Sequence, residues 1–436
     1  MNLRETKSIF TLAVPLVIGQ LGQMLLGVVD TIMVGKVGVL DLAALSFANS
    51  LWIVPFVFGI GVLTCVSIHT SSARGKGETA FARNVCRNGL YLGALIGLVM
   101  FLLSMLAFPF LDQLKQPPEV VARSEIYYLI IMLSLIPCIM SLALKNHADA
   151  LDRPWPAFWI FMAGVGLNIL LNAALIFGLW GFPELGLEGA GISTFVARIF
   201  IVIGMIWWFS KDRSLSDWIP EHWLKKPDWK EIASLLKLGF PAGLQTLAEV
   251  STFAAAGLMI GVFGAEALAA HQIALQSSGM AFMIPLGISM ALTVRMGETG
   301  NDTQRQRSIV TTGWVLTLIS SCTTAAIFIF AGTTIANWFI DNSGIVSLAA
   351  SLLIVSGVFQ IVDGLQVAST GLLRGLHDTR TPANIAILSY WVVGIPSGYL
   401  YAHYFGLEAR GIWWGLATGL GVASLFLSAR VWKKTA

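Results

Sequence analysis

The stretch IFTLAVPLVIGQLGQMLLGVVDTIMVG (residues 9–35) contains a single charged side chain, that of Asp30. A helix that crosses a bilayer needs about 20 mostly apolar residues, and this stretch is longer than that. Its apolar residues form a continuous run and do not alternate with polar ones, which favours a spanning helix over a strand of a membrane β-barrel. The run is also too long for a signal peptide. The stretch therefore predicts a membrane-spanning helix with one acid inside it.

The composition of the whole chain fits a protein built from such helices. Hydrophobic residues make up 56% of the 436 residues and charged residues only 12%. Soluble domains carry about 25% charged residues, roughly twice as many. The net charge of +3 gives no signal for binding nucleic acid. The composition thus excludes an ordinary soluble enzyme, a disordered chain and a nucleic-acid-binding protein.

Lys and Arg concentrate at both termini and in alternate loops, for example in 74–87 after the second apolar run and in 211–230 after the sixth. By the positive-inside rule, both termini are then cytoplasmic. We expect a multi-pass monomer in the lipid bilayer of the cell's inner (plasma) membrane. Reading between polar breaks predicts twelve spanning helices, at 9–35, 43–71, 88–111, 126–148, 156–181, 188–210, 232–262, 268–294, 308–338, 345–373, 382–404 and 410–430.

The two halves of the sequence match each other, which indicates an internal repeat. Pro15 in LAVP aligns with Pro241 in LGFP, a shift of 226 residues, and MVG (33–35) aligns with MIG (259–261) at the same shift. We therefore expect an N-lobe with helices 1–6 in residues 1–210, a cytoplasmic linker at 211–231 and a C-lobe with helices 7–12 in residues 232–436.

An even number of spans in each half gives both halves the same orientation. The predicted fold is an all-α polytopic membrane protein with two parallel six-helix bundles, related by a pseudo-two-fold axis along the membrane normal. Rocking one bundle against the other can open a cleft to either side of the membrane. This organisation is typical of secondary transporters.

Three acids lie inside the predicted spans, where a charge costs several kcal/mol and indicates a functional site. At 1.5 Å per residue, Asp30, Glu249 and Asp363 lie about 9, 18 and 16 Å from the nearer end of their helices. They could lock helix packing, or they could bind a proton or a hard cation and couple its gradient to movement. None of the three is duplicated in the other half, which favours coupling. Polar neighbours at helical spacing are Gln23 for Asp30, Gln245 for Glu249 and Gln360 for Asp363.

Other intramembrane polar residues have weaker indications. Asn168 and Asn172 are four residues apart and could face Asp30, although a role in helix packing is equally compatible with this spacing. Gln272 follows His271 near the outer surface, where a plain interfacial polar pair is favoured. No Ser/His/Asp or HExxH arrangement is present in the sequence.

The twelve spans, the two halves and the acids resemble the MATE (multidrug and toxic compound extrusion) family, and within it the NorM-like branch. The resemblance covers essentially the whole chain. Its most specific segments are GVVDTIMVG (27–35), AEVSTF (248–253), AAHQIAL (269–275), VDGLQVASTGLLRGLHDTRTP (362–382) and YWVVGIPSGY (390–399).

The resemblance implies roles for individual residues. Asp30 matches the first-lobe acid involved in coupling, and Asn168 and Asn172 match the asparagine pair beside it. Glu249 and Asp363 match the second-lobe acids that hold Na⁺ in NorM-type members.

The chain departs from the family pattern at two positions. Phe359 stands where NorM relatives often have Tyr, which removes one possible oxygen ligand. Arg198 lies about 15 Å inside its span, where a charge needs a partner. We hypothesise that Arg198 pairs with Asp30 in at least one conformational state, which would make Asp30 a poorer proton carrier.

The function that these features predict is secondary active multidrug efflux. Amphipathic, cationic compounds such as drugs and cationic dyes are exported by alternating access in exchange for Na⁺ or H⁺, without a cofactor and without enzymatic activity. An alternative is a flippase or exporter of lipid-linked or other polar metabolites, which should line its cleft with several Arg or Lys, whereas only Arg198 is a candidate. A channel would tolerate the acids, but it would conduct ions without counter-transport.

Overall fold

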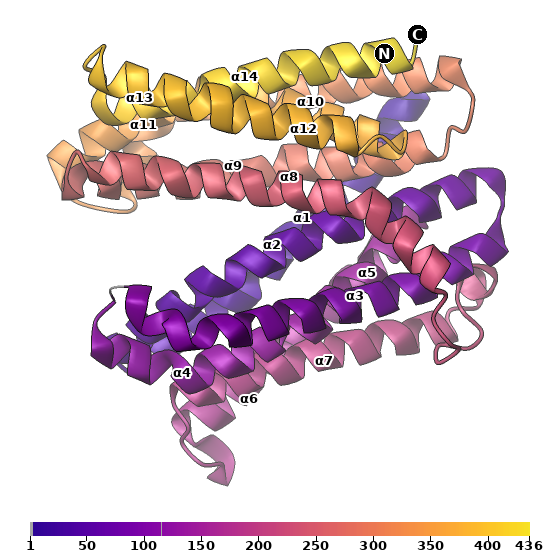
Figure 1. Cartoon of the computed structure of the whole chain (residues 1–436), viewed down its shortest axis with the longest axis horizontal. Helices are drawn as coiled ribbons and strands as arrows, with labels where there is room; N and C mark the ends of the chain where they lie inside the picture. Colours follow the sequence, from indigo (N-terminus) through magenta and orange to yellow (C-terminus); the bar gives the residue numbers. More distant parts are fainter. Residues whose placement is uncertain (1–2, 115) are drawn as a thin grey trace. The chain divides into compact units, whose positions relative to one another are not determined.

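The computed structural model describes residues 3–114 and 116–436, and within them it contains helices and no strand (Figure 1). Twelve helical segments of the described chain are long and apolar enough to cross a membrane, which confirms the predicted number of spans. The elements are α1 (Leu3–Gly35), α2 (Val39–Lys76), α3 (Thr79–Ala107), η1 (Phe108–Leu114), α4 (Pro118–Leu133), α5 (Leu135–Ala150), α6 (Pro154–Phe177), η2 (Leu179–Gly181), α7 (Leu187–Lys211), η3 (Arg213–Trp218), α8 (Trp229–Gly261), α9 (Ala265–Gly297), α10 (Thr303–Asn337), α11 (Ser343–Gly375), α12 (Arg380–Leu388), η4 (Ser389–Gly394), α13 (Ile395–His403) and α14 (Glu408–Lys434).

Three of the spans combine more than one helical element, and in two of them a proline explains a break in the middle of the span. Pro137 lacks the N–H that would bond one turn back, and α4 gives way to α5 at Ser134. Pro396 follows η4, a π-helical segment that joins α12 to α13 within one span. Segments of π-helix are often found at functional sites, because the wider turn displaces side chains from their α-helical positions.

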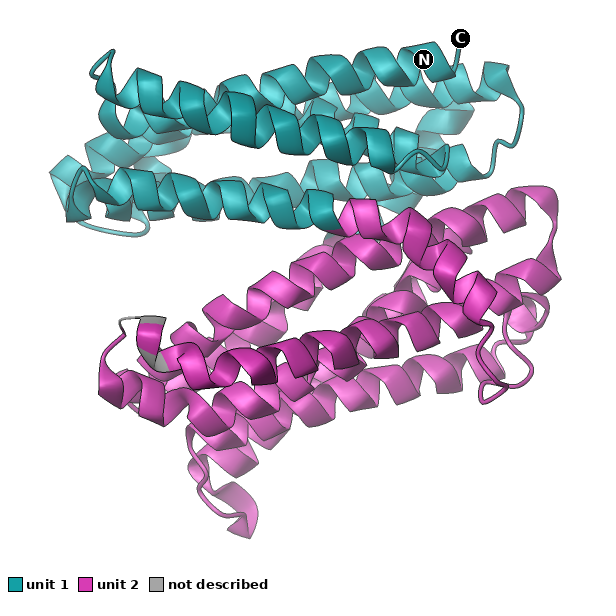
Figure 2. Cartoon of the chain, viewed as in Figure 1, with its two compact units in different colours: residues 1–17, 244–436 teal, residues 18–243 magenta. Residues whose placement is uncertain are grey.

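The described chain divides into two compact units, which are coloured separately in Figure 2. Unit 2 comprises Ile18–Gly243, and unit 1 comprises Met1–Val17 together with Leu244–Ala436. The chain passes from one unit to the other after Val17 and after Gly243. Each of these points lies two residues beyond one of the repeat-related prolines, Pro15 and Pro241. The first parts of α1 and α8 therefore belong to the unit opposite to the one expected from their place in the sequence. The predicted lobes, 1–210 and 232–436, differ from the units in these segments, and their boundaries remain a prediction.

Close helix contacts hold the first part of α8 in unit 2. A Cβ atom at Gly239 would lie 2.1 Å from the backbone oxygen of Val62 on α2, so only glycine fits there. Ile232 and Leu235 on the same face of α8 are buried in the apolar core that α2, α3, α4 and α5 share. This packing fixes the start of α8 against α2.

In unit 1, α11 is the central helix and packs against α9, α10 and α14. The α14 helix also packs closely against α13 and η4. At the tightest point, a Cβ on Gly415 would lie 2.2 Å from the Cα of Gly398, so two glycines meet backbone to backbone. This approach brings the side chains of α14 next to the π-helical segment η4, where the candidate site lies.

Candidate functional site

The carboxylate of Asp30 is the centre of a buried polar network in unit 2. Asn172 Nδ2 donates to Asp30 Oδ1 at 2.7 Å, and Thr194 Oγ1 donates to Asp30 Oδ2 at 2.5 Å. Asn168 donates to Thr194 Oγ1 at 3.1 Å and accepts from Asn172 at 3.2 Å. All four side chains are buried. The structure thus brings the two asparagines to Asp30, as the spacing on α6 allowed, and adds Thr194.

Arg198 makes no ion pair with Asp30 in this structure. Its Nη1 donates to Ser134 Oγ, and its guanidinium carbon lies 4.4 Å above the ring centroid of Trp52. The second contact is a cation–π interaction. Both carboxylate oxygens of Asp30 accept hydrogen bonds from other side chains, and Asp30 and Arg198 attract each other without direct contact. The hypothesised ion pair is therefore not formed in the conformation described.

Two of the predicted supporting glutamines lie apart from the acids. Gln23 on α1 is half-buried, and its Nε2 donates to Gln20 Oε1 at 3.2 Å. Gln272 on α9 is exposed, whereas its neighbour His271 is buried and accepts a hydrogen bond from Trp413 Nε1 at 3.2 Å. The structure does not bring either glutamine into contact with an intramembrane carboxylate.

Unit 1 brings together the other two acids, Glu249 from α8 and Asp363 from α11, and they act on each other electrostatically. Asp363 is 3% exposed. Among the described residues, its Oδ1 has no hydrogen-bond partner. A buried carboxylate oxygen without a donor is costly, because the water it loses is not replaced. The pair is therefore suited to bind a proton or a cation.

Arg374 lies in the same region and provides a positive charge that the sequence reasoning did not assign to the site. Its Nη2 donates to Gln245 Oε1 at 3.2 Å, so Gln245 joins the end of α11 to α8. Arg374 attracts Glu249 but forms no ion pair with it within the described chain. Gln245 thus acts on Glu249 indirectly, by holding this guanidinium in place.

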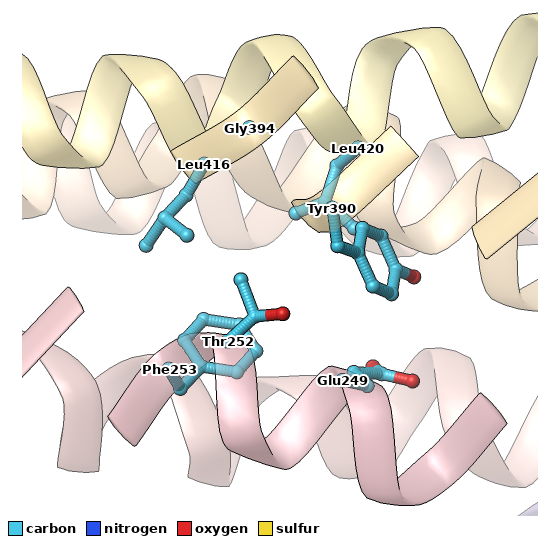
Figure 3. A pocket seen from close by; sticks show the side chains of 7 residues that line it. All are labelled: Glu249, Thr252, Phe253, Tyr390, Gly394, Leu416 and Leu420. Atoms are coloured by element: carbon cyan, nitrogen blue, oxygen red, sulfur yellow. The ribbon is translucent and has the colours of Figure 1, made fainter. Parts of the chain in front are cut away.

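A small cavity next to Glu249 completes the site, and its volume is about 10 Å³. This is roughly the room that one water molecule needs, and it is far below the several hundred Å³ of a drug site. Figure 3 shows Glu249 from α8 and Tyr390 from η4 at one end of the cavity, and Phe253 and Leu416 at the other. The lining residues are Glu249, Thr252, Phe253, Tyr390, Gly394, Leu416 and Leu420.

Tyr390 contributes an oxygen that the sequence reasoning missed. The side chain is 3% exposed, and its hydroxyl interacts with the side chain of Gln366 on α11. Electrostatically it interacts with both Glu249 and Asp363. Phe359, in contrast, packs edge-on against Phe253 and Trp413, with ring centroids 5.9 and 5.8 Å apart. The phenol oxygen absent at position 359 has a counterpart at Tyr390.

Gln360 forms a hydrogen bond to a neighbouring helix and not to the acids. Its Nε2 donates to the backbone oxygen of Ser278 at 3.0 Å, and Ser278 Oγ lies 2.6 Å from Ser356 Oγ. These bonds join α11 to α9. Gln360 therefore supports the helix that carries Asp363.

The donor set of unit 1 consists of two carboxylates and a phenol. Such hard oxygen donors suit a proton or an alkali or alkaline-earth cation. No group of three or more His, Cys, Asp and Glu side chains that could hold a metal ion occurs in residues 3–114 and 116–436. The chemistry available is therefore reversible binding of a small cation next to a fixed arginine.

Comparison with known proteins agrees with this architecture. The MatE family model matches the chain twice, over residues 15–174 and 241–400. The matches begin at the two aligned prolines, so they reproduce the internal repeat. The probable multidrug resistance protein NorM of Bradyrhizobium diazoefficiens is 35% identical over 430 residues, which cover 96% of this chain and 91% of that protein. Multidrug resistance protein PmpM of Pseudomonas aeruginosa is 33% identical over 440 residues, 98% and 91% of the two chains.

Solved structures share the fold at lower sequence identity. The eukaryotic MATE transporter AtDTX14 matches with a TM-score of 0.89 and 22% identity, over 99% of this chain and 97% of that one. A multidrug resistance MATE transporter in an outward-facing conformation matches with a TM-score of 0.89 and 18% identity, over 99% and 96%. The described residues contain twelve helical segments long and apolar enough to cross a membrane, and the family model matches both halves of the chain, so the protein is a multi-pass membrane transporter. It belongs to the MATE family, whose members are transporters and not enzymes.

Proposed function

We propose that this protein is a secondary active multidrug efflux antiporter. It exports amphipathic cationic compounds in exchange for Na⁺ or H⁺ by alternating access. Its relatives of similar length are named multidrug resistance proteins, and they align over nearly the whole chain. The protein acts as a monomer in the cell's inner membrane. Both termini lie in the cytoplasm, because Lys and Arg concentrate at the termini and in alternate loops.

The observation that carries the coupling proposal is the pair Glu249 and Asp363. Asp363 is buried and Glu249 is half-buried in unit 1, and an unpartnered oxygen of Asp363 and the hydroxyl of Tyr390 are available as ligands. The adjoining cavity of about 10 Å³ admits an ion or a water molecule and excludes a drug. Cation binding in unit 1 is therefore separate from the binding of the organic cargo.

Asp30 has a supporting role in this proposal. Its two oxygens already accept hydrogen bonds from Asn172 and Thr194, so the carboxylate is stabilised without an added cation. Any proton or cation that binds there competes with these donors for the carboxylate oxygens. We therefore assign the main coupling step to Glu249 and Asp363, and a conformational role to the Asp30 network in unit 2.

Transport by purified protein in liposomes tests the proposal. Liposomes loaded with a fluorescent cationic dye are given a Na⁺ gradient or a pH gradient separately, and dye movement is recorded for wild type, Glu249→Gln and Asp363→Asn. Glu266→Gln is the matched control, because this acid is exposed at the start of α9. We expect gradient-driven transport in wild type and the control, and its loss in the two site variants. Transport that persists in both site variants would reject the assigned site.

A further inference from the structure

A second pocket lies in unit 2, at the end of the helices where the linker joins α7 to α8. Its volume is about 570 Å³, large enough for a small organic or phosphate group. One wall comes from the first turns of α3, and the others come from residues 225–228 and the start of α8. The lining residues are Asn84, Arg87, Lys225, Lys226, Pro227, Asp228, Trp229 and Lys230.

Hydrogen bonds to α3 fix the segment that carries the two adjacent lysines. The hydroxyl of Tyr91 lies 3.1 Å from the backbone oxygen of Lys225 and 3.2 Å from that of Trp223. Further along, the backbone N–H of Asp228 donates to Asn88 Oδ1 at 3.0 Å, and Asn88 is fully buried. Both ends of residues 225–228 are therefore held against one helix. The hydrogen bonds therefore fix the shape of this wall of the pocket within unit 2.

The lining of the pocket has an excess of positive charge, with four basic residues and one acid. Arg87, Lys225, Lys226 and Lys230 contribute four positive charges, and none of them forms an ion pair with a described residue. The one lining acid, Asp228, accepts the backbone N–H groups of Lys230 and Glu231 at 3.0 and 3.3 Å, so it caps the start of α8. Four cations gathered in one pocket indicate an anionic ligand, since a bound anion relieves their mutual repulsion.

Exposed apolar side chains beside the pocket favour a lipid over a free anion as its ligand. Leu224 is 94% exposed and Trp229 is 65% exposed, and they flank the lysine pair in the sequence. Tryptophan is enriched where a membrane meets water, and basic pockets at the ends of spanning helices hold the head groups of anionic lipids. A free phosphate would use the charges only, whereas a phospholipid also covers the apolar flank.

We propose that this pocket binds the phosphate head group of an anionic phospholipid, of the phosphatidylglycerol or cardiolipin type. The phosphate lies among Arg87, Lys225 and Lys230, and the acyl chains lie along Leu224 and Trp229. The bound head group bridges α3 and the first turn of α8, so it stabilises the attachment of α8 to unit 2. This inference concerns a separate site and does not depend on the identity of the coupling ion.

Lipid binding is measured on the full chain by native mass spectrometry and by thermal stabilisation in detergent. Phosphatidylglycerol and phosphatidylcholine serve as probes. One variant combines Lys225→Gln, Lys226→Gln and Lys230→Gln. The matched control removes the same charge elsewhere, with Lys7→Gln, Lys76→Gln and Lys211→Gln, all exposed. We expect wild type and control to prefer phosphatidylglycerol, and the pocket variant to lose this preference by about tenfold or more, since each lysine near an anionic head group attracts it.

Two results would overturn the proposal. An equal loss of preference in the pocket variant and in the control would mean that lipid binding follows total charge and not this pocket. A second arm uses inorganic phosphate as the probe and adds the variant Leu224→Asn. If inorganic phosphate stabilises the protein as much as the lipid does, and Leu224→Asn leaves lipid binding unchanged, the site takes a soluble anion and not a lipid.

Discussion

Asn172 donates a hydrogen bond of 2.7 Å to Asp30, across a sequence separation of 142 residues. With Thr194 on the second carboxylate oxygen, this bond ties α1, α6 and α7 together inside unit 2. A buried, charge-assisted hydrogen bond of this kind contributes more than a neutral one. The network therefore acts on both the stability and the conformation of the unit.

The variant Thr194→Val tests the network, because valine has nearly the shape of threonine without the hydroxyl. It leaves one oxygen of Asp30 without a donor, which should cost about 1–3 kcal/mol. We expect a lower midpoint of thermal unfolding for Thr194→Val, while Thr194→Ser, which keeps the donor, stays close to wild type. Equal unfolding midpoints for the valine and serine variants would contradict the assigned bond.

The contact between Arg198 and Trp52 should be measurable as a coupling energy. A buried cation–π interaction contributes up to about 2 kcal/mol, and an exposed one about 0.5–1 kcal/mol. Unfolding free energies of Arg198→Met, Trp52→Leu and the double variant should give a favourable coupling of about 1 kcal/mol. Strict additivity of the two single variants would show that the ring does not hold the guanidinium.

Replacing Tyr390 with Phe removes an oxygen from the site and keeps the ring that lines the cavity. Loss of one ligand or hydrogen bond costs about 1–1.5 kcal/mol, so the apparent affinity for the coupling ion should fall about tenfold. The ion-concentration dependence of dye transport gives this affinity. Tyr399→Phe, at an exposed position on α13, is the matched control and should behave as wild type. An unchanged ion affinity in Tyr390→Phe would exclude the phenol as a ligand.

Arg374 should weaken cation binding at Glu249 by repulsion. The variant Arg374→Met removes this charge, and we expect the apparent affinity for the coupling ion to rise by about tenfold, or ~1.4 kcal/mol. Turnover should fall, because a tightly held ion is released slowly. Arg374→Lys keeps the charge and should change the affinity much less. A weaker ion affinity in the methionine variant would assign Arg374 a purely structural role through Gln245.

Asp378, between α11 and α12, gives the protein a pH-dependent contribution to stability. Partial burial opposes its ionisation, but Lys434 at 3.0 Å and Arg430 at 3.1 Å prevail and hold the pKa of Asp378 below its usual range. A carboxyl group with a lowered pKa in the folded state stabilises the fold above its unfolded pKa of about 3.9, and this effect disappears as the pH falls through the folded value.

The variant Asp378→Asn should therefore be less stable than wild type at neutral pH, and the difference should narrow as the pH falls below about 4. Urea or thermal unfolding at a series of pH values measures it. A difference that does not change with pH would show that the asparagine acts through packing and not through the lost charge.

Much of the fold could be predicted from the sequence because a membrane span is a long local pattern. The run 9–35 is read from consecutive residues, and so is the repeat that aligns Pro15 with Pro241. The exchange of the first parts of α1 and α8 between the compact units could not be read in this way. For α8 it depends on a backbone contact between Gly239 and Val62, and for α1 on the contact between Val17 and Gly287, all far apart in the sequence.

The site was predictable only in part, for the same reason. Asp30, Glu249 and Asp363 were visible as charges in apolar surroundings, where they are expensive. Thr194 is an ordinary residue in a spanning helix, and only its contact with Asp30 reveals its role. In the sequence, Arg374 is only the charged residue that follows the predicted span 345–373. Its tie to Gln245 comes from the packing of α11 against α8, which no local pattern encodes.

Simultaneous recording of the ion flux and the dye flux tests whether Glu249 and Asp363 couple ion entry to cargo exit. Liposomes with reconstituted protein receive only a gradient of a cationic dye, and Na⁺ and H⁺ movements are recorded with dye movement. We expect the dye gradient to drive one of these ions in the opposite direction in wild type and Glu266→Gln, and this ion flux to be lost in Glu249→Gln and Asp363→Asn. Dye movement in wild type without any opposed ion flux, or an ion flux that survives in both site variants, would contradict this coupling.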